Sequence, residues 1–224
     1  MLRTLRGRRG FTLLEVTVTV AIAVIITALA YTSLWRLRPR AQLANVAAEL
    51  DSLLHGARLS AMANGKNVAV LFFPQYANGQ GTGRLVVYQD GNYTLFSSAA
   101  AVNFEGYAPA SPAADTASQV LDTYDLPQGV VIGPPAGMGA SATLPAPLAG
   151  LDVTRACTFC GGLADGRGAV VFDPRGRATF YGQNAPVAQP TVGASVSLYA
   201  SDVDGTRTIV ITGATGALRV FNNG

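Results

Sequence analysis

Glu15 is the side chain with the most informative chemistry, because it lies inside a largely apolar segment, residues 11–35. The segment is long enough to cross the hydrocarbon core of a bilayer. A carboxylate in such a segment costs roughly 2.5 to 3.5 kcal/mol at worst on insertion scales, and ionisable residues in that position usually have a function. At low dielectric, a carboxylate attracts an amine far more strongly than in water. The pattern favours an ion pair for Glu15; a carboxylate that snorkels to the interface is the structural alternative.

The sequence lacks any constellation that is typical of an enzyme. It contains one His, His55, and no recognisable arrangement of an activated Ser or Cys, no phosphate-binding loop and no paired carboxylates at a diagnostic spacing. His55 lies on a predicted helix with nothing nearby to activate it. We therefore expect a structural or assembly protein, with no catalytic residue, no cofactor and no resident metal.

Cys157 and Cys160 form a C-x-x-C motif in a loop-like stretch, and they favour a short-range disulfide if the domain is exported to an oxidising compartment. Half a zinc site and a redox-active pair are the alternatives. No second C-x-x-C accompanies the motif and no thioredoxin-like elements surround it, so both alternatives are weaker. Residues 202–205 resemble the opening of a calcium loop, but Gly213 stands where the bidentate Glu should be.

The net charge of +3 is misleading, because four arginines lie in the first ten residues. Without them, the 16 Lys and Arg fall to 12, against 13 Asp and Glu. The basic balance of the whole chain is therefore no argument for nucleic-acid binding.

The elements that must position Glu15 begin with a membrane helix over residues 11–36. The N-terminal arginines place the N-terminus in the cytoplasm by the positive-inside rule, although arginines at 36, 38 and 40 weaken the contrast. The alternative is a twin-arginine-like export signal at Arg8-Arg9 that is cleaved near Ala30, so that the chain would start at Tyr31. Helix-compatible sequence continues past Ala30, which favours a retained helix.

An amphipathic helix is predicted over residues 37–64, where apolar residues recur at spacings of three and four. Pro39 predicts a kink or break between the two helical halves, and Asn64-Gly65 predicts the end of the second. Arg58, on a face otherwise rich in Ala and Leu, is expected to anchor carbonyl groups of the sheet or its loops.

One β domain is predicted over residues 65–224. The first expected strands cover residues 67–73, 84–90, 93–96 and 129–132, with turns at Asn78-Gly79 and Asp90-Gly91 and a hairpin at the second turn. The later strands, from residue 169 on, are expected to form an antiparallel meander with turns at 174–176, 204–205 and 215–216. Stretches near 108–117 and 133–150, rich in Ala, Pro and Gly, are expected to be surface loops, the second a lid or insertion. The fold class is therefore α+β.

The N-terminus resembles the class III signal of type IV pilins and pseudopilins, through the Arg-rich leader (residues 1–10), the Gly10-Phe11 junction and Glu15 in the run FTLLEV. The resemblance implies that a prepilin peptidase cleaves between Gly10 and Phe11 and methylates the new amine. It also implies that Glu15, then the fifth residue, attracts the N-terminal amine of a neighbouring subunit during docking.

The domain resembles the GspH/FimT family of minor pseudopilins, through the helix around Ala57-Arg58, the run VVFDPRGRATF and the C-terminal run TIVITGATGALRV. This implies a type IV pilin-like fold, a long N-terminal helix packed on antiparallel β-sheets. The implied partners are other major and minor pilins or pseudopilins, the peptidase, the inner-membrane assembly platform and membrane lipid. The implied location is the bacterial inner membrane, with the domain on the extracytoplasmic side, and then a filament or its tip.

Three functions are compatible with this resemblance. The first is a minor subunit that primes or caps a type IV pilus; the second is a pseudopilin of a type II secretion system. The third is a DNA-binding minor pilin for transformation, since some FimT-like proteins bind DNA through basic residues near the C-terminus. Here the candidates for phosphate contact are Arg175, Arg177, Arg207 and Arg219, and one of the two C-terminal arginines that the resemblance calls for is missing.

Overall fold

The computed structural model consists of two compact units, Met1–Arg38 and Pro39–Gly224. The structure describes residues 12–99, 103–110, 118–133, 144–151, 153, 155–161, 165–187, 193–200 and 206–223, with the backbone alone at 32–37 and 223.

Helix α1, Leu13–Asn64, includes the two helical halves expected from the sequence. Of the kink or break expected at Pro39, the break is absent, since the helix continues through this residue. A proline in a helix removes one backbone hydrogen bond, and the many remaining bonds of a 52-residue helix sustain it. The boundary between the two compact units nevertheless falls between Arg38 and Pro39.

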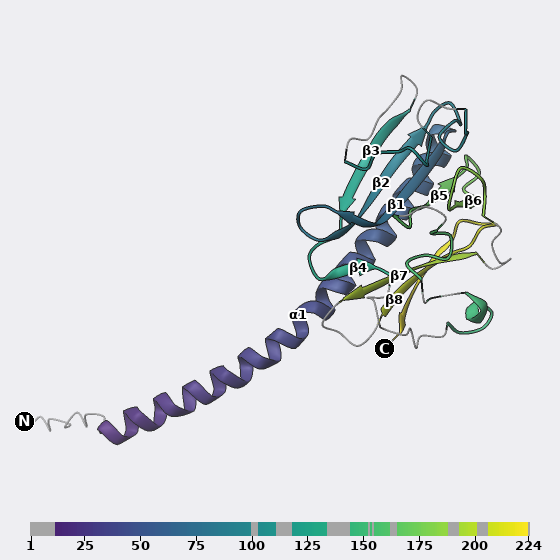
Figure 1. Cartoon of the computed structure of the whole chain (residues 1–224). Helices are drawn as coiled ribbons and strands as arrows, with labels where there is room; N and C mark the ends of the chain where they lie inside the picture. Colours follow the sequence, from purple (N-terminus) through teal and green to yellow (C-terminus); the bar gives the residue numbers. More distant parts are fainter. Residues whose placement is uncertain are drawn as a thin grey trace, which may run out of the picture. The chain divides into compact units, whose positions relative to one another are not determined.

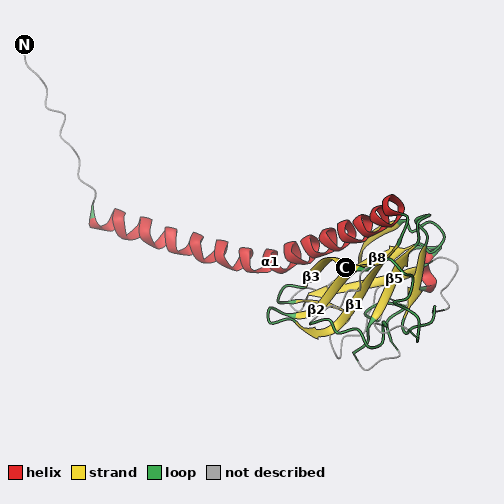
Figure 2. Cartoon of the chain, turned by 90° about the horizontal axis from the view of Figure 1, so that it is seen from above, coloured by secondary structure: helices red, strands yellow, loops and turns green. Residues whose placement is uncertain are grey.

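The second half of α1 buries one face in the central core of the domain. Its buried residues recur every three or four positions: Leu43, Val46, Ala47, Leu50, Leu54, Ala57 and Ala61. At about 100° per residue, this spacing keeps them on one side of the helix. This second half of the helix therefore forms a layer against the sheets, as Figures 1 and 2 show.

Two antiparallel sheets complete the domain (Figure 1). The first sheet has the order β3-β2-β1-β5-β6 and the second the order β4-β7-β8-β9. The strands of the first are β1 (Asn67–Ala77), β2 (Thr82–Asp90), β3 (Gln119–Asp125), β5 (Gly168–Phe172) and β6 (Ala178–Tyr181). Those of the second are β4 (Val130–Ile132), β7 (Ala194–Ala200), β8 (Thr206–Ile211) and β9 (Leu218–Asn223). This is the expected α+β layout of a helix on antiparallel sheets.

Two expectations about the strands are wrong. Residues 93–96 form turns and no strand, so the Asp90-Gly91 turn closes no hairpin, and β2 pairs instead with the distant β3. The later strands also do not form one meander. β5 and β6 join the first sheet through the β1–β5 pairing, and only β7, β8 and β9 continue as neighbours in the second. Both outcomes depend on long-range pairing, which local turn signals do not report.

The described part of residues 91–110 covers the outer face of the first sheet. There Leu95, Phe104 and Tyr107 pack against the outward side chains of β1, β2 and β5. As both faces are covered, β1 is buried continuously from Val68 to Phe73, which explains its unbroken apolar sequence.

Part of the predicted 133–150 surface loop is also core. Leu144, Leu148 and Leu151 are buried against the outer face of the second sheet, together with Val210. A short 3-10 helix, Leu148–Gly150, contributes Leu148 to this cluster, while Leu144 precedes the helix and Leu151 follows it. The prediction of a surface loop is therefore wrong for Leu144 and Leu148, whereas residues 145–147, 149 and 150 are exposed. Residues 134–143 and 111–117 lie outside the described residues. The composition of this stretch favoured a surface loop because Ala, Pro and Gly surround a few widely spaced leucines.

Candidate functional site

The N-terminus of α1 positions Glu15 in the first helical turn. Thr12 precedes the helix, and its Oγ1 accepts a hydrogen bond from the backbone N–H of Glu15 at 3.3 Å. This is one half of a capping box, Thr-x-x-Glu. A carboxylate in this turn also complements the positive end of the helix dipole. Glu15 is exposed, and no side-chain partner is found for it among the described residues. Gly10 and Phe11 lie outside the described residues.

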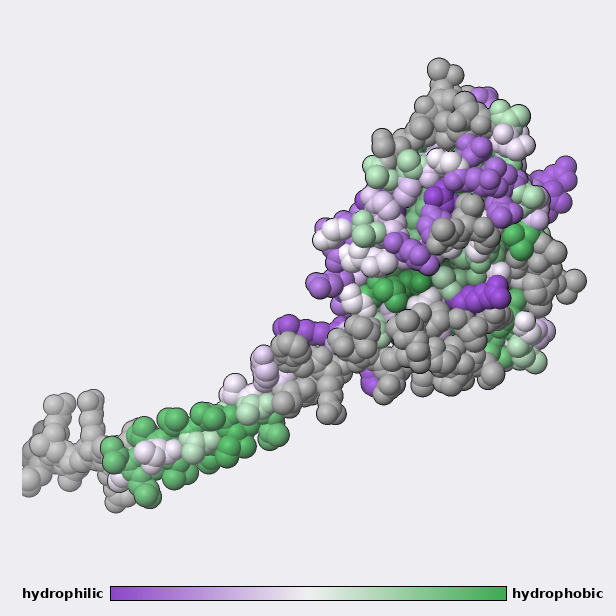
Figure 3. Space-filling model, viewed as in Figure 1, coloured by the Kyte–Doolittle hydropathy of each residue, from purple (hydrophilic) through white to green (hydrophobic). Residues whose placement is uncertain are grey.

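The first half of α1 exposes an apolar surface. The stretch Leu13–Tyr31 has a mean hydropathy of 2.4 and none of it is buried, so it meets the length and composition of one membrane span. Figure 3 shows the apolar side chains covering this helix. Threonine hydroxyls in it are satisfied locally: Thr19 donates to the carbonyls of Glu15 and Val16, and Thr27 to that of Ala23. This is what a helix in lipid requires.

The C-x-x-C loop fills the space between the two sheets. The structure joins Cys157 and Cys160 in a disulfide, with Cα atoms 5.0 Å apart. Between them, Thr158 exchanges hydrogen bonds with Ser195 of β7, and Phe159 is buried. The Phe159 ring lies 5.5 Å from that of Phe72. The loop thus has a packing role, and the disulfide in the cell stays a prediction.

We expect loss of the disulfide, through the paired change Cys157→Ser and Cys160→Ser, to lower the free energy of unfolding by about 2 kcal/mol. A bridge across so short a loop removes about this much chain entropy from the unfolded state. Urea unfolding of the oxidised chain in detergent, with and without reductant, measures the difference. The disulfide would be contradicted if the urea midpoint did not change on reduction and if mass spectrometry showed that both thiols could be alkylated before any reductant was added.

Arg58 anchors turns of the sheets, as expected from its position on an Ala- and Leu-rich helix face. Its Nε donates to the carbonyl of Gly176 at 3.2 Å. Gly216 packs against the same two groups, since a Cβ on it would lie 2.2 Å from the Gly176 oxygen and 3.2 Å from Arg58 Nε. Both glycines have positive φ, so the close approach of the two turns to Arg58 requires glycine at each.

The four arginines proposed to contact DNA do not form one surface. Arg207 on β8 lies on the same side as Ile209 and Ile211, which face the central core. Arg219 on β9 pairs with Val210, which faces the opposite way. Successive strand residues alternate between faces, so Arg207 and Arg219 point to opposite sides of the second sheet. Arg177 is already paired with Asp173, its Nη2 2.8 Å from Oδ2.

Asp173 holds the turn between β5 and β6 in a fixed shape. Its Oδ1 accepts hydrogen bonds from the backbone N–H groups of Arg175 and Arg177, each at 2.9 Å. Burial alone would raise the pKa of Asp173, but the backbone and side-chain hydrogen bonds and the charge of Arg177 together hold it below its ordinary value. Arg175 is exposed at the tip of this turn and has no side-chain partner in the described part of the chain.

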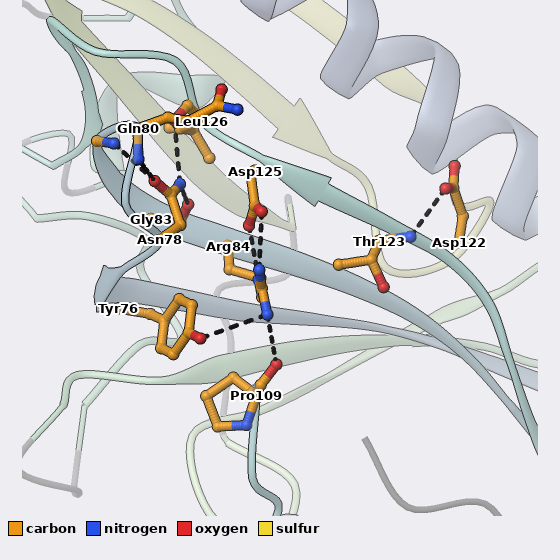
Figure 4. A network of polar contacts seen from close by, with 11 residues as sticks. Tyr76, Asn78, Gln80, Gly83, Arg84, Pro109, Asp122, Thr123, Asp125 and Leu126 are labelled. Atoms are coloured by element: carbon orange, nitrogen blue, oxygen red, sulfur yellow. Dashed lines mark hydrogen bonds and ion pairs between the residues drawn. The ribbon is translucent and has the colours of Figure 1, made fainter. Parts of the chain in front are cut away.

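Two other arginines, which the sequence did not single out, hold the covering loops. Arg84 forms two hydrogen bonds with Asp125, at 2.6 and 2.7 Å, and donates to the carbonyl of Pro109 at 2.8 Å (Figure 4). The hydrogen bond to Asp125 raises the pKa of Arg84 against the effect of burial. Arg167 donates to the carbonyls of Phe104 and Tyr107. Both are architectural, and no sequence signal marked them because their partners are distant.

A groove of about 720 Å³ lies between α1 and the edge strand β3, and the sequence did not indicate it. Three small helix residues, Ser52, Gly56 and Ser60, form part of one wall, and Leu121, Asp122 and Tyr124 of β3 form part of the other. The hydroxyl of Tyr124 donates to Glu49. Burial, and then the hydrogen bond to Glu49, raise the pKa of Tyr124.

In the part of the chain that the structure describes, no group of three or more His, Cys, Asp or Glu residues is placed to hold a metal ion. The polar contacts of His55 that involve described residues are with its helical neighbour Asp51, whose Oδ1 lies 3.7 Å from His55 Nδ1. Residues 202–205, which resembled a calcium loop, lie outside the described residues.

A comparison with family models matches residues 5–31 to the prokaryotic N-terminal methylation motif. The matched residues include the Gly10-Phe11 junction and Glu15. No curated protein and no solved structure matches the chain. The match supports a type IV pilin-like protein, a structural subunit of the pilin or pseudopilin type that carries a prepilin signal.

Proposed function

We propose that this protein is a minor pilin or pseudopilin of the GspH/FimT type that primes assembly of a type IV pilus or caps it. The observation that carries the proposal is the exposed apolar half of α1 behind a prepilin signal. A helix with this much unburied apolar surface needs lipid first and then other helices around it. The separately packed β domain supplies the part outside the membrane.

Glu15 is the residue proposed to guide docking. Its carboxylate lies one helical turn from the proposed new N-terminus at Phe11, and it is exposed with no side-chain partner among the described residues. After cleavage by the prepilin peptidase, the amine of a neighbouring subunit is the natural countercharge, because the membrane interior strengthens the attraction. The capping contact with Thr12 keeps the helix regular while leaving the carboxylate available.

The first experiment compares Glu15→Ala and Glu15→Gln with the native chain in its own cells. We expect both variants to be cleaved between Gly10 and Phe11 at a normal rate. The amount that enters filaments should fall by about tenfold or more, which corresponds to a loss of at least about 1.4 kcal/mol of docking free energy. Mass spectrometry of the N-terminal peptide measures processing, and sheared filament fractions measure incorporation. Thr17→Val, on the neighbouring turn, is the control. Normal incorporation of both Glu15 variants would refute the docking role.

Capture of the tagged chain after in-cell crosslinking tests which machine uses it. Type IV pilus subunits among the partners would support the priming or capping role. Pseudopilins of a type II secretion system would favour the alternative, since the same prepilin features serve that system. A chain that starts at Tyr31 would refute both and favour the export-signal interpretation.

A DNA-binding role has less support than either filament role. Arg207 and Arg219 lie on opposite faces of their sheet, and Arg177 is neutralised by Asp173. A steep dependence of DNA affinity on salt would need several unpaired cations on one surface.

A further inference from the structure

The groove between α1 and β3 has the chemistry of a receptor for an arginine side chain. Its apolar floor includes Leu53, Ala57 and Val87, which suits the aliphatic stem of arginine. Glu49 and Asp122 supply two carboxylates. Among the described residues, one oxygen of Glu49 is bonded to Tyr124 and one of Asp122 to the backbone of Thr123 at 2.8 Å, so each carboxylate retains an oxygen for an incoming donor.

The wall formed by α1 includes small residues, which leave space for a protruding turn. Ser52, Gly56 and Ser60 recur every four residues, so they lie along one flank of the helix. A large side chain at any of them would fill the space that the groove leaves open. Leu121, on the opposite wall, exposes 38% of its surface and offers an apolar contact at the rim.

The complementary feature on the same domain is the turn at residues 173–177. Pro174 and Arg175 are exposed at its tip. Asp173 fixes the turn from inside with three hydrogen bonds, and Arg58 holds it from the helix. A turn held in one shape loses little conformational entropy on docking. Arg175 is therefore a preorganised cation that awaits a carboxylate outside its own fold.

The turn and the groove lie on opposite flanks of α1. Arg58 faces the turn and Gly56 faces the groove, and two residues along a helix are about 200° apart around it. The turn of one copy therefore cannot reach its own groove. Contact between the turn of one copy and the groove of another uses different surfaces on the two copies, so it is directional and can repeat.

We propose that two copies of this chain associate head to tail, with the Pro174-Arg175 turn of one seated in the α1–β3 groove of the other. Arg175 pairs with Glu49 and Asp122, and Pro174 packs on Leu121. The contact joins β domains, so it is distinct from the proposed role of Glu15 in the membrane.

Cysteine crosslinking of the full chain in native membranes tests the contact. One tagged copy carries Leu121→Cys, and a second, with a different tag, carries Pro174→Cys. We expect a disulfide-linked pair containing both tags. Tyr93→Cys replaces Leu121→Cys in the control, since Tyr93 is 54% exposed and lies outside the groove. Absence of the mixed pair, an equal yield with Tyr93→Cys, or efficient pairing of Leu121→Cys with itself would each overturn the proposal.

A charge exchange distinguishes specific docking from chance collision. Arg175→Glu in the copy that carries Pro174→Cys should reduce the mixed pair at least tenfold. Asp122→Arg in the copy that carries Leu121→Cys should then restore it, which also shows that the variants fold. Failure of the restoration would contradict the pairing. Cleavage after Gly10 is measured in the same samples. Loss of the contact with normal cleavage would count against the contact and leave the proposed function intact. Failed cleavage would count against the proposed function alone.

Discussion

Replacing Gly193 with Ala is expected to lower the free energy of unfolding by at least about 3 kcal/mol. Gly193 has φ of +124°, a conformation that L side chains rarely adopt. A Cβ on it would lie 2.1 Å from the carbonyl oxygen of Ile211 and 2.8 Å from Cα of Thr212. Both are backbone atoms of the strand and turn that pair with β7, so relief of the clash would shift the second sheet. Urea unfolding of the chain in detergent, followed by near-ultraviolet circular dichroism, measures the loss.

Gly56→Ala is the matched control for this prediction. Gly56 lies in the interior of α1, and a Cβ added there meets nothing within 4 Å. The same chemical change should therefore raise the free energy of unfolding by about 0.5 to 1 kcal/mol, because alanine favours the helix. If both changes shifted stability in the same direction and by similar amounts, the close contact at Gly193 would be wrong.

Phe159→Ala is expected to cost about 3 to 5 kcal/mol, the range for truncating a fully buried aromatic side chain. Phe159 is 2% exposed, and its ring lies 5.5 Å from those of both Phe72 and Phe180. The surroundings of Phe159 are closely packed. A Cβ at Gly168 would already lie 2.7 Å from the Phe159 ring, and one at Gly182 would lie 2.7 Å from its carbonyl oxygen.

The same unfolding experiment measures this loss, and Leu59→Ala provides the comparison. Leu59 is 60% exposed on α1, so its truncation should change stability by less than about 0.5 kcal/mol. A loss of under about 1.5 kcal/mol for Phe159→Ala would mean that the C-x-x-C loop is not packed between the sheets. The Phe159 result also separates packing from the disulfide, which the cysteine variants test independently.

Features governed by neighbours in the chain were predictable from the sequence. The apolar run that contains Glu15 predicted the membrane-type helix, and the spacing of Leu43, Leu50, Leu54 and Ala61 predicted the buried face of its second half. Strands β1, β2 and β4 to β9 were expected near their observed positions, because alternating or continuous apolar runs bounded by turn residues are local signals. The role of Arg58 as an anchor was also predictable, since a charged residue on an apolar helix face needs an acceptor.

Tertiary structure alone decided which strands pair and what the pairing brings together. β3 was missed because its polar sequence shows little apolar pattern, and its pairing with β2 spans the covering loop. The bond from Arg84 to Asp125 and the groove beside Glu49 both follow from such pairings. Burial over the whole domain selects these contacts, since each brings together residues far apart in the chain and is stabilised only when the sheets and the helix close around one core.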